Sequence, residues 1–161
     1  MKKIKLFTDG SVNPQKKIGF GAYLLLTDDN LKNLDDLKSN VILKRFENTS
    51  STKLEIQTLL WALSDINIID STIEIYTDCQ NIIGLLHRKE KLQALDYHSS
   101  SGKLLNNSEL YRDFFKLLEK YNCEFIKVKG HKKNSLKNDI DEVFNIVDKA
   151  ARTALRGESK T

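Results

Sequence analysis

The chain has 161 residues, of which 40% are hydrophobic and 30% are charged, and its formal net charge is +4. This length and composition are typical of one globular domain and exclude a disordered chain. The longest uncharged run, residues 18–27, is too short to cross a membrane, and the two cysteines have neither zinc-ligand nor redox spacing. We therefore expect a monomeric protein of a reducing cytoplasm, with no membrane partner.

The first part of the chain is predicted to form three strands and then a helix. Strands rich in β-branched and aromatic residues are expected at residues 4–8, 19–26 and 41–46. The turn-like segments between them predict an antiparallel meander. The acidic and polar segment 27–40 is expected to be an exposed loop, and the spacing of apolar residues predicts a helix over 52–66.

Strands and helices alternate in the second part of the chain. The sequence predicts strands at 73–77 and 124–128, and helices at 80–86, 108–120 and 140–156. Strands that are separated by helices usually pair in parallel with an earlier strand. The predicted fold class is α/β, with a five-stranded mixed sheet, three antiparallel strands and then parallel strands, flanked by helices. We expect a single domain over residues 1–156 and a frayed tail over 157–161.

Four acidic residues lie where a lone carboxylate is costly. Asp9 and Asp78 each follow a threonine at the end of a predicted buried strand. Glu55 and Asp148 fall on the apolar faces of two predicted helices. Two strands that pair side by side would bring Asp9 and Asp78 together, so four carboxylates would converge without a nearby arginine. A divalent cation is the natural counter-charge, and ligation by oxygen alone favours Mg²⁺ or Mn²⁺ over zinc.

Each acid also has a structural explanation. The alternatives are a turn at Asp9-Gly10, a capping box from Thr52 to Glu55, a helix cap at Asp78 and an ion pair between Asp148 and Arg152. Helical spacing weakens the second and the last of them, because both helical acids are expected to face the sheet. Taken together, the four positions favour a metal site.

Five short segments carry a specific pattern. They are Phe7-Thr8-Asp9-Gly10-Ser11, Thr52-Lys53-Leu54-Glu55, Tyr76-Thr77-Asp78-Cys79-Gln80, Val128-Lys129-Gly130-His131 and Val147-Asp148-Lys149-Ala150-Ala151-Arg152. In this order they resemble type 1 ribonuclease H, the family of enzymes that cut the RNA strand of an RNA/DNA hybrid. One such motif would be weak evidence, whereas five in order are highly specific. The resemblance covers nearly the whole chain and implies a ribonuclease H-like fold.

The resemblance implies a function and a set of residues. The protein would be an Mg²⁺-dependent endoribonuclease that binds RNA/DNA hybrids and leaves 3′-hydroxyl and 5′-phosphate ends. Its catalytic residues would be Asp9, Glu55, Asp78, His131 and Asp148, of which the four acids would hold two Mg²⁺ ions, with Mn²⁺ as a substitute. Its substrate-binding residues would be Gly10, Ser11, Asn13, Thr52 and Gln80. The chain departs from the pattern at Ser51 and Thr52, where many relatives carry asparagine or glutamine.

Two aspartates compete for the last place in the metal site. Asp141 lies ten positions after His131, which is the separation common in the family, and Asp148 lies seventeen positions after it. We choose Asp148 because Ala151 and Arg152 follow it at the offsets of the family's final helix. Asp141 is then expected to be a helix cap or a surface residue.

Two other functions remain open at this point. The chain could be a nucleic-acid-binding module that kept the fold and lost catalysis, but all four acids are present. It could also be a nuclease of the same superfamily that acts on DNA junctions or ends. His131 and Asn13 argue against that second alternative, and the basic residues 87–91 suit any polyanion.

Overall fold

The computed structural model describes residues 2–27, 34–129 and 139–158. The strands in these ranges are β1 (Lys2–Asn13), β2 (Ile18–Leu26), β3 (Ile42–Glu47), β4 (Ser71–Thr77) and β5 (Asn122–Lys127). The helices in the same ranges are α1 (Leu34–Ser39), α2 (Ser51–Ile66), α3 (Gln80–His87), α4 (Lys89–Ala94), α5 (Ser108–Lys120) and α6 (Asp139–Glu158).

The strands form one mixed sheet in the order β3-β2-β1-β4-β5. β2 pairs antiparallel with both β1 and β3, which gives the expected meander. β4 runs parallel to β1, and β5 runs parallel to β4. The predicted α/β fold with a five-stranded mixed sheet is therefore confirmed, and β1 lies at the centre of the sheet.

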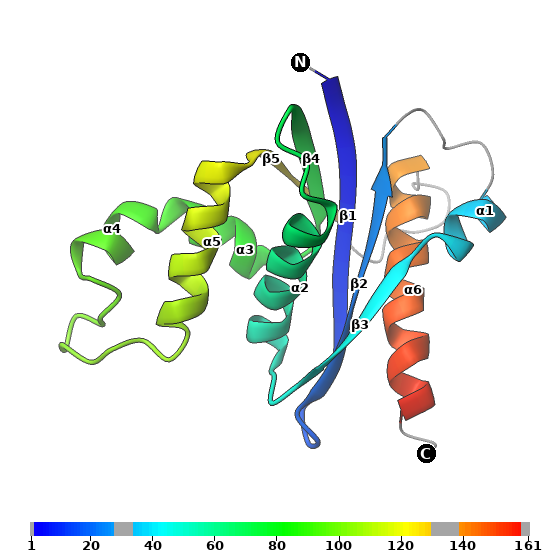
Figure 1. Ribbon diagram of the computed structural model, residues 1–161. Helices are drawn as coiled ribbons and strands as arrows, with labels where there is room; N and C mark the ends of the chain where they lie inside the picture. Colours follow the sequence, from blue (N-terminus) through cyan, green and yellow to red (C-terminus); the bar gives the residue numbers. More distant parts are fainter. Residues whose placement is uncertain (1, 28–33, 130–138, 159–161) are drawn as a thin grey trace.

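Helices cover both faces of this sheet (Figure 1): α2, α3 and α5 lie on one side, and α6 lies on the other with α1 beside it. Neighbouring residues of β1 serve opposite faces, as the alternation of a strand requires. Leu6 packs in the core cluster that contains Leu59 of α2, and Phe7 packs in the cluster that contains Val147 of α6. The centre of the sheet is thus buried on both sides.

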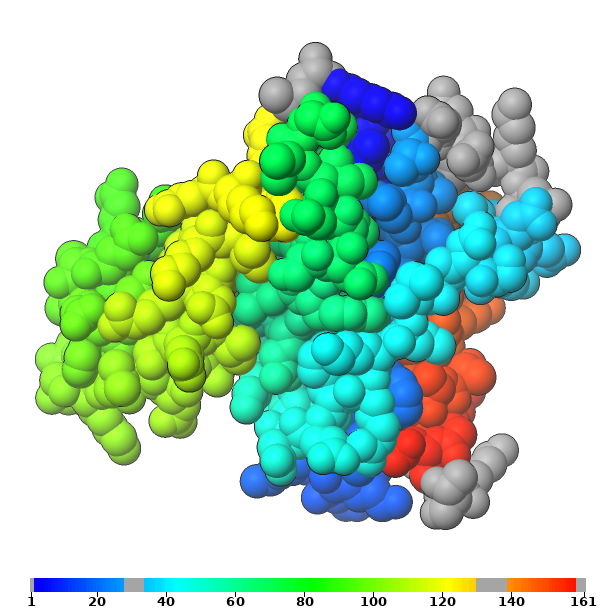
Figure 2. All heavy atoms as spheres, in the orientation of Figure 1, coloured from blue at the N-terminus to red at the C-terminus, as the bar shows by residue number. Residues whose placement is uncertain are grey.

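Two short helices were not predicted. The segment expected to be an exposed loop contains α1, whose Leu37 is 3% exposed and joins the core cluster under α6. That expectation was wrong because a single buried leucine docks a six-residue helix that has no periodic pattern of its own. α4 begins the second unpredicted region, and Figure 2 shows that α4 and the chain leading to α5 stand out from the body.

The four predicted helices are present as α2, α3, α5 and α6, with ends that differ from the prediction by at most two residues. α6 continues to Glu158, two residues beyond the predicted end, and Arg45 of β3 forms an ion pair with that glutamate at 2.9 Å. No helix in the described ranges is both long enough and apolar enough to cross a membrane.

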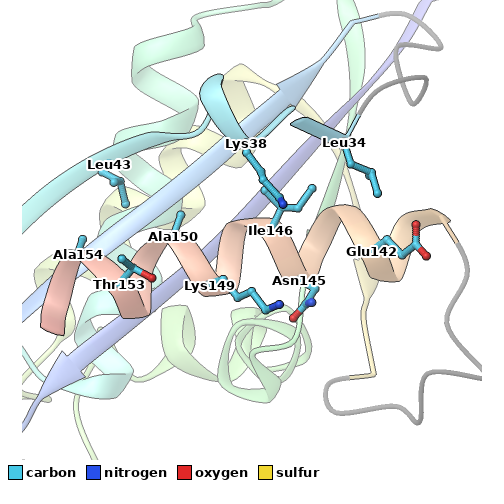
Figure 3. Close-up of a pocket in the computed structure, with 10 residues that line it drawn as sticks. All are labelled: Leu34, Lys38, Leu43, Glu142, Asn145, Ile146, Lys149, Ala150, Thr153 and Ala154. Carbon is cyan, nitrogen blue, oxygen red and sulfur yellow. The ribbon is translucent and has the colours of Figure 1, made fainter. Parts of the chain in front are cut away.

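A groove with a volume of about 700 Å³ lies between α1, β3 and α6 (Figure 3). Its lining includes Leu34, Leu43 and Ile146, with Lys38 and Lys149 among the polar groups. None of the four candidate acids belongs to this lining. The groove and the acids are therefore separate features, although both involve α6.

Candidate active site

The parallel pairing of β1 with β4 brings two aspartates together just beyond the last paired residues. Asp9 and Asp78 each lie two residues beyond the last paired position of the parallel β1–β4 register. Asp9 is 4% exposed and still lies inside β1, which continues past Gly10 to the end of the strand. The proposed turn at this dipeptide is therefore wrong. The N-cap residue of α3 is Cys79, so Asp78 is not the helix cap either.

Glu55 reaches the same edge from α2. The N-cap of this helix is Ser50, whose side chain accepts a hydrogen bond from the backbone N–H of Lys53. The predicted capping box, in which Thr52 would be the cap, is therefore wrong. Glu55 instead accepts a hydrogen bond from the backbone N–H of Gly10, which ties the helix to the central strand.

Glycines allow α2 to approach the sheet this closely. A Cβ atom at Gly10 would lie 2.9 Å from Cδ2 of Leu54 and 3.6 Å from Oε1 of Glu55. A Cβ atom at Gly21 of β2 would lie 2.3 Å from Oγ1 of Thr58. Because larger residues would push the helix away, these glycines fix the position of the acid that α2 carries.

Asp148 approaches from the α6 side of the sheet. Its side chain is 27% exposed, and its carboxyl group shares a hydrogen bond with that of Asp9. Its Oδ2 atom also forms an ion pair with Nη2 of Arg152 at 2.8 Å. The proposed ion pair is confirmed, and the expectation that the acids converge without a nearby arginine is wrong.

Burial and mutual repulsion make these acids hard to ionise together. Burial above all, and then the charges of Glu55, Asp78 and Asp148, raise the pKa of Asp9 to about 10. Burial above all, and then the charges of Asp78 and Asp148, raise the pKa of Glu55 to about 8. The hydrogen bond from Gly10 acts in the opposite direction and lowers this pKa. Asp9 interacts with all three other acids, so the structure brings the four together. A cation would relieve this repulsion.

The four acids fit a hard divalent cation, because carboxylate oxygens are the ligands that Mg²⁺ prefers. Within the described ranges, however, no three His, Cys, Asp or Glu side chains already form a metal-binding group. Asp9 and Asp148 are instead joined by a hydrogen bond through one proton. A bound cation would take the place of that proton.

The family model described as RNase H matches residues 1–156 of the chain. The chain belongs to the ribonuclease H family. A protein named Ribonuclease H from Clostridium botulinum (strain Hall) is 28% identical over 150 residues, which are 90% of this chain and 95% of that protein. A Ribonuclease H from Caldicellulosiruptor saccharolyticus is 26% identical over 155 residues, which are 94% of this chain and 100% of the relative. The resemblance inferred from the five motifs is thus confirmed.

In this ribonuclease H family member, residues predicted to bind substrate surround the acids. Gly10 and Ser11 continue β1 directly after Asp9. Asn13 ends the strand, and its Oδ1 atom accepts hydrogen bonds from the N–H groups of two turn residues at 3.1 and 3.2 Å. The amide oxygen of Asn13 therefore shapes the β1–β2 turn, which leaves its NH₂ group as the side that a ligand would meet.

Thr52 and Gln80 lie at the starts of α2 and α3. Oγ1 of Thr52 accepts a hydrogen bond from Nδ2 of Asn81 at 3.4 Å, and Oε1 of Gln80 accepts one from the ammonium group of Lys127. These contacts connect the two helix starts and tie α3 to the end of β5. Asn81 was not singled out by the sequence analysis, and the substrate-binding roles of Thr52 and Gln80 stay predictions.

Two further predictions concern the segment that leads into α6. His131 lies outside the described residues, so its role stays a prediction. Asp141 lies in the first turn of α6 and is 8% exposed, so the expectation of a surface residue is wrong. The α6 acid that contacts Asp9 is Asp148, which supports the choice made from the local motif.

Proposed function

We propose that this protein is an endoribonuclease that hydrolyses the RNA strand of RNA/DNA hybrids with two bound Mg²⁺ ions and leaves 3′-hydroxyl and 5′-phosphate ends. The observation that carries the proposal is the convergence of Asp9, Glu55, Asp78 and Asp148 at one edge of the sheet. Membership of the ribonuclease H family supports the reaction class, because its relatives carry that name.

Each acid would contribute oxygen ligands from a rigid element. Asp9 lies within β1 and Asp78 directly follows β4, its parallel neighbour, and Glu55 is held by the N–H of Gly10. Two divalent ions, when bound, supply activation of the attacking water and stabilisation of the departing 3′ oxygen, so the reaction needs no covalent enzyme intermediate. By resemblance, His131 would move a proton or assist product departure, since an unperturbed histidine has a pKa of about 6.5.

Selection of the RNA strand would follow from the 2′-hydroxyl groups, which a hybrid carries on one strand only. Ser11 and Thr52 lie on the elements that carry Asp9 and Glu55, and Gln80 begins α3 two positions after Asp78. These three residues would contact the hybrid across its minor groove. Asn13 would contribute as a hydrogen-bond donor, because its oxygen already accepts two turn hydrogen bonds. Exposed basic residues such as Arg88 would add affinity for phosphate without sequence preference.

The test is cleavage of matched duplexes by the purified protein. RNA/DNA, RNA/RNA and DNA/DNA duplexes of one sequence and a DNA four-way junction are incubated with Mg²⁺ or with EDTA, and the Asp9→Asn variant serves as the inactive control. We expect cuts in the RNA strand of the hybrid alone, dependent on Mg²⁺ and absent in the variant. Product ends are then identified by their reaction with a 3′-hydroxyl-dependent ligase or a 5′-phosphate-dependent exonuclease.

The outcomes separate the three functions. Equal cutting of duplex RNA, or undiminished cutting in EDTA, would contradict the proposal. Cutting of the DNA junction in preference to the hybrid would favour the junction nuclease. Tight binding of the hybrid by wild type and variant alike, with no cleavage by either, would favour the binding module.

A further inference from the structure

The ion pair between Arg152 and Asp148 differs from an ordinary pair on a helix surface. Nη2 of Arg152 lies 2.8 Å from Oδ2 of Asp148, one turn earlier on α6. Exposed pairs at this spacing add little to stability and keep their polar groups in water. Here, Nε of Arg152 is buried and has no hydrogen-bond partner in the described part of the chain. A buried N–H without an acceptor is costly, although the side chain of Arg152 as a whole is 42% exposed.

Asp148 has two polar contacts, one with another acid and one with a base. Its hydrogen bond with Asp9 joins it to the acid cluster. Its contact with Arg152 joins a carboxylate to a permanent cation, which does not lose its proton in proteins. Oδ2 of Asp148 is therefore engaged with the chain's own positive charge beside the acid cluster.

We propose that Arg152 is a positioning residue that limits the affinity of the acid site for Mg²⁺. It holds Asp148 through Oδ2, and it places a fixed positive charge beside the site. The inference rests on the proposed function, because it takes the four acids as the metal ligands. The inference adds to that function a residue of α6 that lowers the affinity for Mg²⁺.

Two effects of Arg152 on metal binding oppose each other. Holding the carboxylate in place favours binding, but the contribution of a helix pair at this spacing is small. Placing like charges a few ångströms apart opposes binding, and in a half-exposed setting such repulsion changes a binding constant by about tenfold. The repulsion is the larger effect, so removal of the charge should tighten Mg²⁺ binding.

The experiment measures Mg²⁺ binding by isothermal titration calorimetry without any nucleic acid. Arg152→Gln removes the charge and keeps a hydrogen-bond donor, and Arg152→Met removes both with a side chain of similar length. We expect both variants to bind Mg²⁺ about tenfold more tightly than wild type, which corresponds to about 1.4 kcal/mol. Arg152→Lys keeps the charge and should stay within about twofold of wild type.

A matched control is available next to the ligand. Lys149→Gln makes the same charge change on an exposed residue adjacent to Asp148, and Lys149 lines the groove on α6. We expect its Mg²⁺ affinity to stay within about twofold of wild type, because its charge is solvated and screened. Circular dichroism establishes that all four variants are folded, and each has a good helix former at an exposed or half-exposed position.

Several results would overturn the inference. These are unchanged or weaker Mg²⁺ binding by Arg152→Gln and Arg152→Met, an equal gain in Arg152→Lys or Lys149→Gln, or no Mg²⁺ binding by the wild-type protein. A merely structural role would lower stability without tightening the metal. Calorimetry also keeps this test apart from the proposed function. Tighter binding in a protein that cuts no hybrid would reject the enzyme and keep the role of Arg152, whereas normal cutting with unchanged affinity would do the reverse.

Discussion

Replacing Asp9 by asparagine should stabilise the metal-free protein even though it removes a proposed ligand. Burial and three neighbouring acids raise the pKa of Asp9 from 3.8 to about 10. At neutral pH the folded protein therefore holds a proton that the unfolded chain releases. Holding this proton lowers the free energy of unfolding by about 1.4 kcal/mol for each pH unit between the unfolded pKa and pH 7, which is about 4 kcal/mol in all. Asparagine has no such proton to hold, and its NH₂ group can still donate to Asp148.

Rearrangement of the neighbouring acids will reduce this gain, and we expect about 2 kcal/mol at neutral pH. For a chain of this length that corresponds to a rise in Tm of about 4 to 8 °C. A carboxyl whose folded pKa is raised contributes stability that is complete below the unfolded pKa and is lost as the pH rises toward the folded pKa. The advantage of Asp9→Asn over wild type should therefore grow from about pH 4 toward about pH 9.

Urea unfolding followed by circular dichroism in EDTA, at about pH 5, 7 and 8.5, measures this difference. Glu119→Gln makes the same charge change on an exposed residue of α5 and controls for the net charge of the protein. Saturating Mg²⁺ should remove the advantage, because the ion stabilises only a protein that can bind it. An asparagine variant no more stable than wild type in EDTA, or one whose advantage does not increase with pH, would refute the reasoning.

The remaining predictions concern the last acid of the site and the glycines under α2. Asp148→Asn should lower Mg²⁺-supported cleavage by about 100-fold or more, and Asp141→Asn should stay within a few-fold of wild type. Steady-state assays of the two folded variants decide this, and the reverse ranking would move the role to Asp141. Gly21→Ala should destabilise the protein by about 1 to 3 kcal/mol, because its Cβ would lie 2.3 Å from Thr58 Oγ1. Gly84→Ala, which meets nothing within 4 Å inside α3, should stabilise it by up to about 1 kcal/mol, and thermal melts that show equal shifts would contradict both assignments.

The sequence was sufficient where burial follows a regular period. Runs of β-branched and aromatic residues predicted the five-stranded mixed sheet, and helical stripes predicted the helices that carry Glu55 and Asp148. The helical period placed both of these acids on faces that meet the sheet. The proximity of Asp9 and Asp78 followed from the pairing of their strands, since both lie two residues beyond the last parallel pair. These inferences needed only a repeating pattern and the rule that buried carboxylates require a partner.

Local rules failed where a distant contact decides the conformation. Asp9-Gly10 is a common turn dipeptide, yet β1 continues through it because β2 pairs with both of these residues. The capping box at the start of α2 failed because Ser50 takes the cap, while Glu55 is drawn to Gly10 of another element. The helix α1 was missed because one residue, Leu37, docks it on the core under α6. None of these contacts leaves a signal within a short window of sequence.

Asp148 shows why structural and catalytic explanations of an acid do not exclude each other. Helical spacing places it on the inner face of α6, and the next turn offers Arg152 as a partner. Sequence reasoning presents the metal site and the ion pair as alternatives, because it assigns one contact to each residue. A carboxylate has two oxygens and about four acceptor sites, so it can accept a guanidinium on one side and meet Asp9 on the other. An acid in such a cluster is therefore tested by changing its partners. We expect a substitution that removes the charge of Arg152 to alter Mg²⁺ affinity, and we expect Asp9→Asn to alter the stability of the metal-free protein. Neither effect follows from a helix ion pair alone.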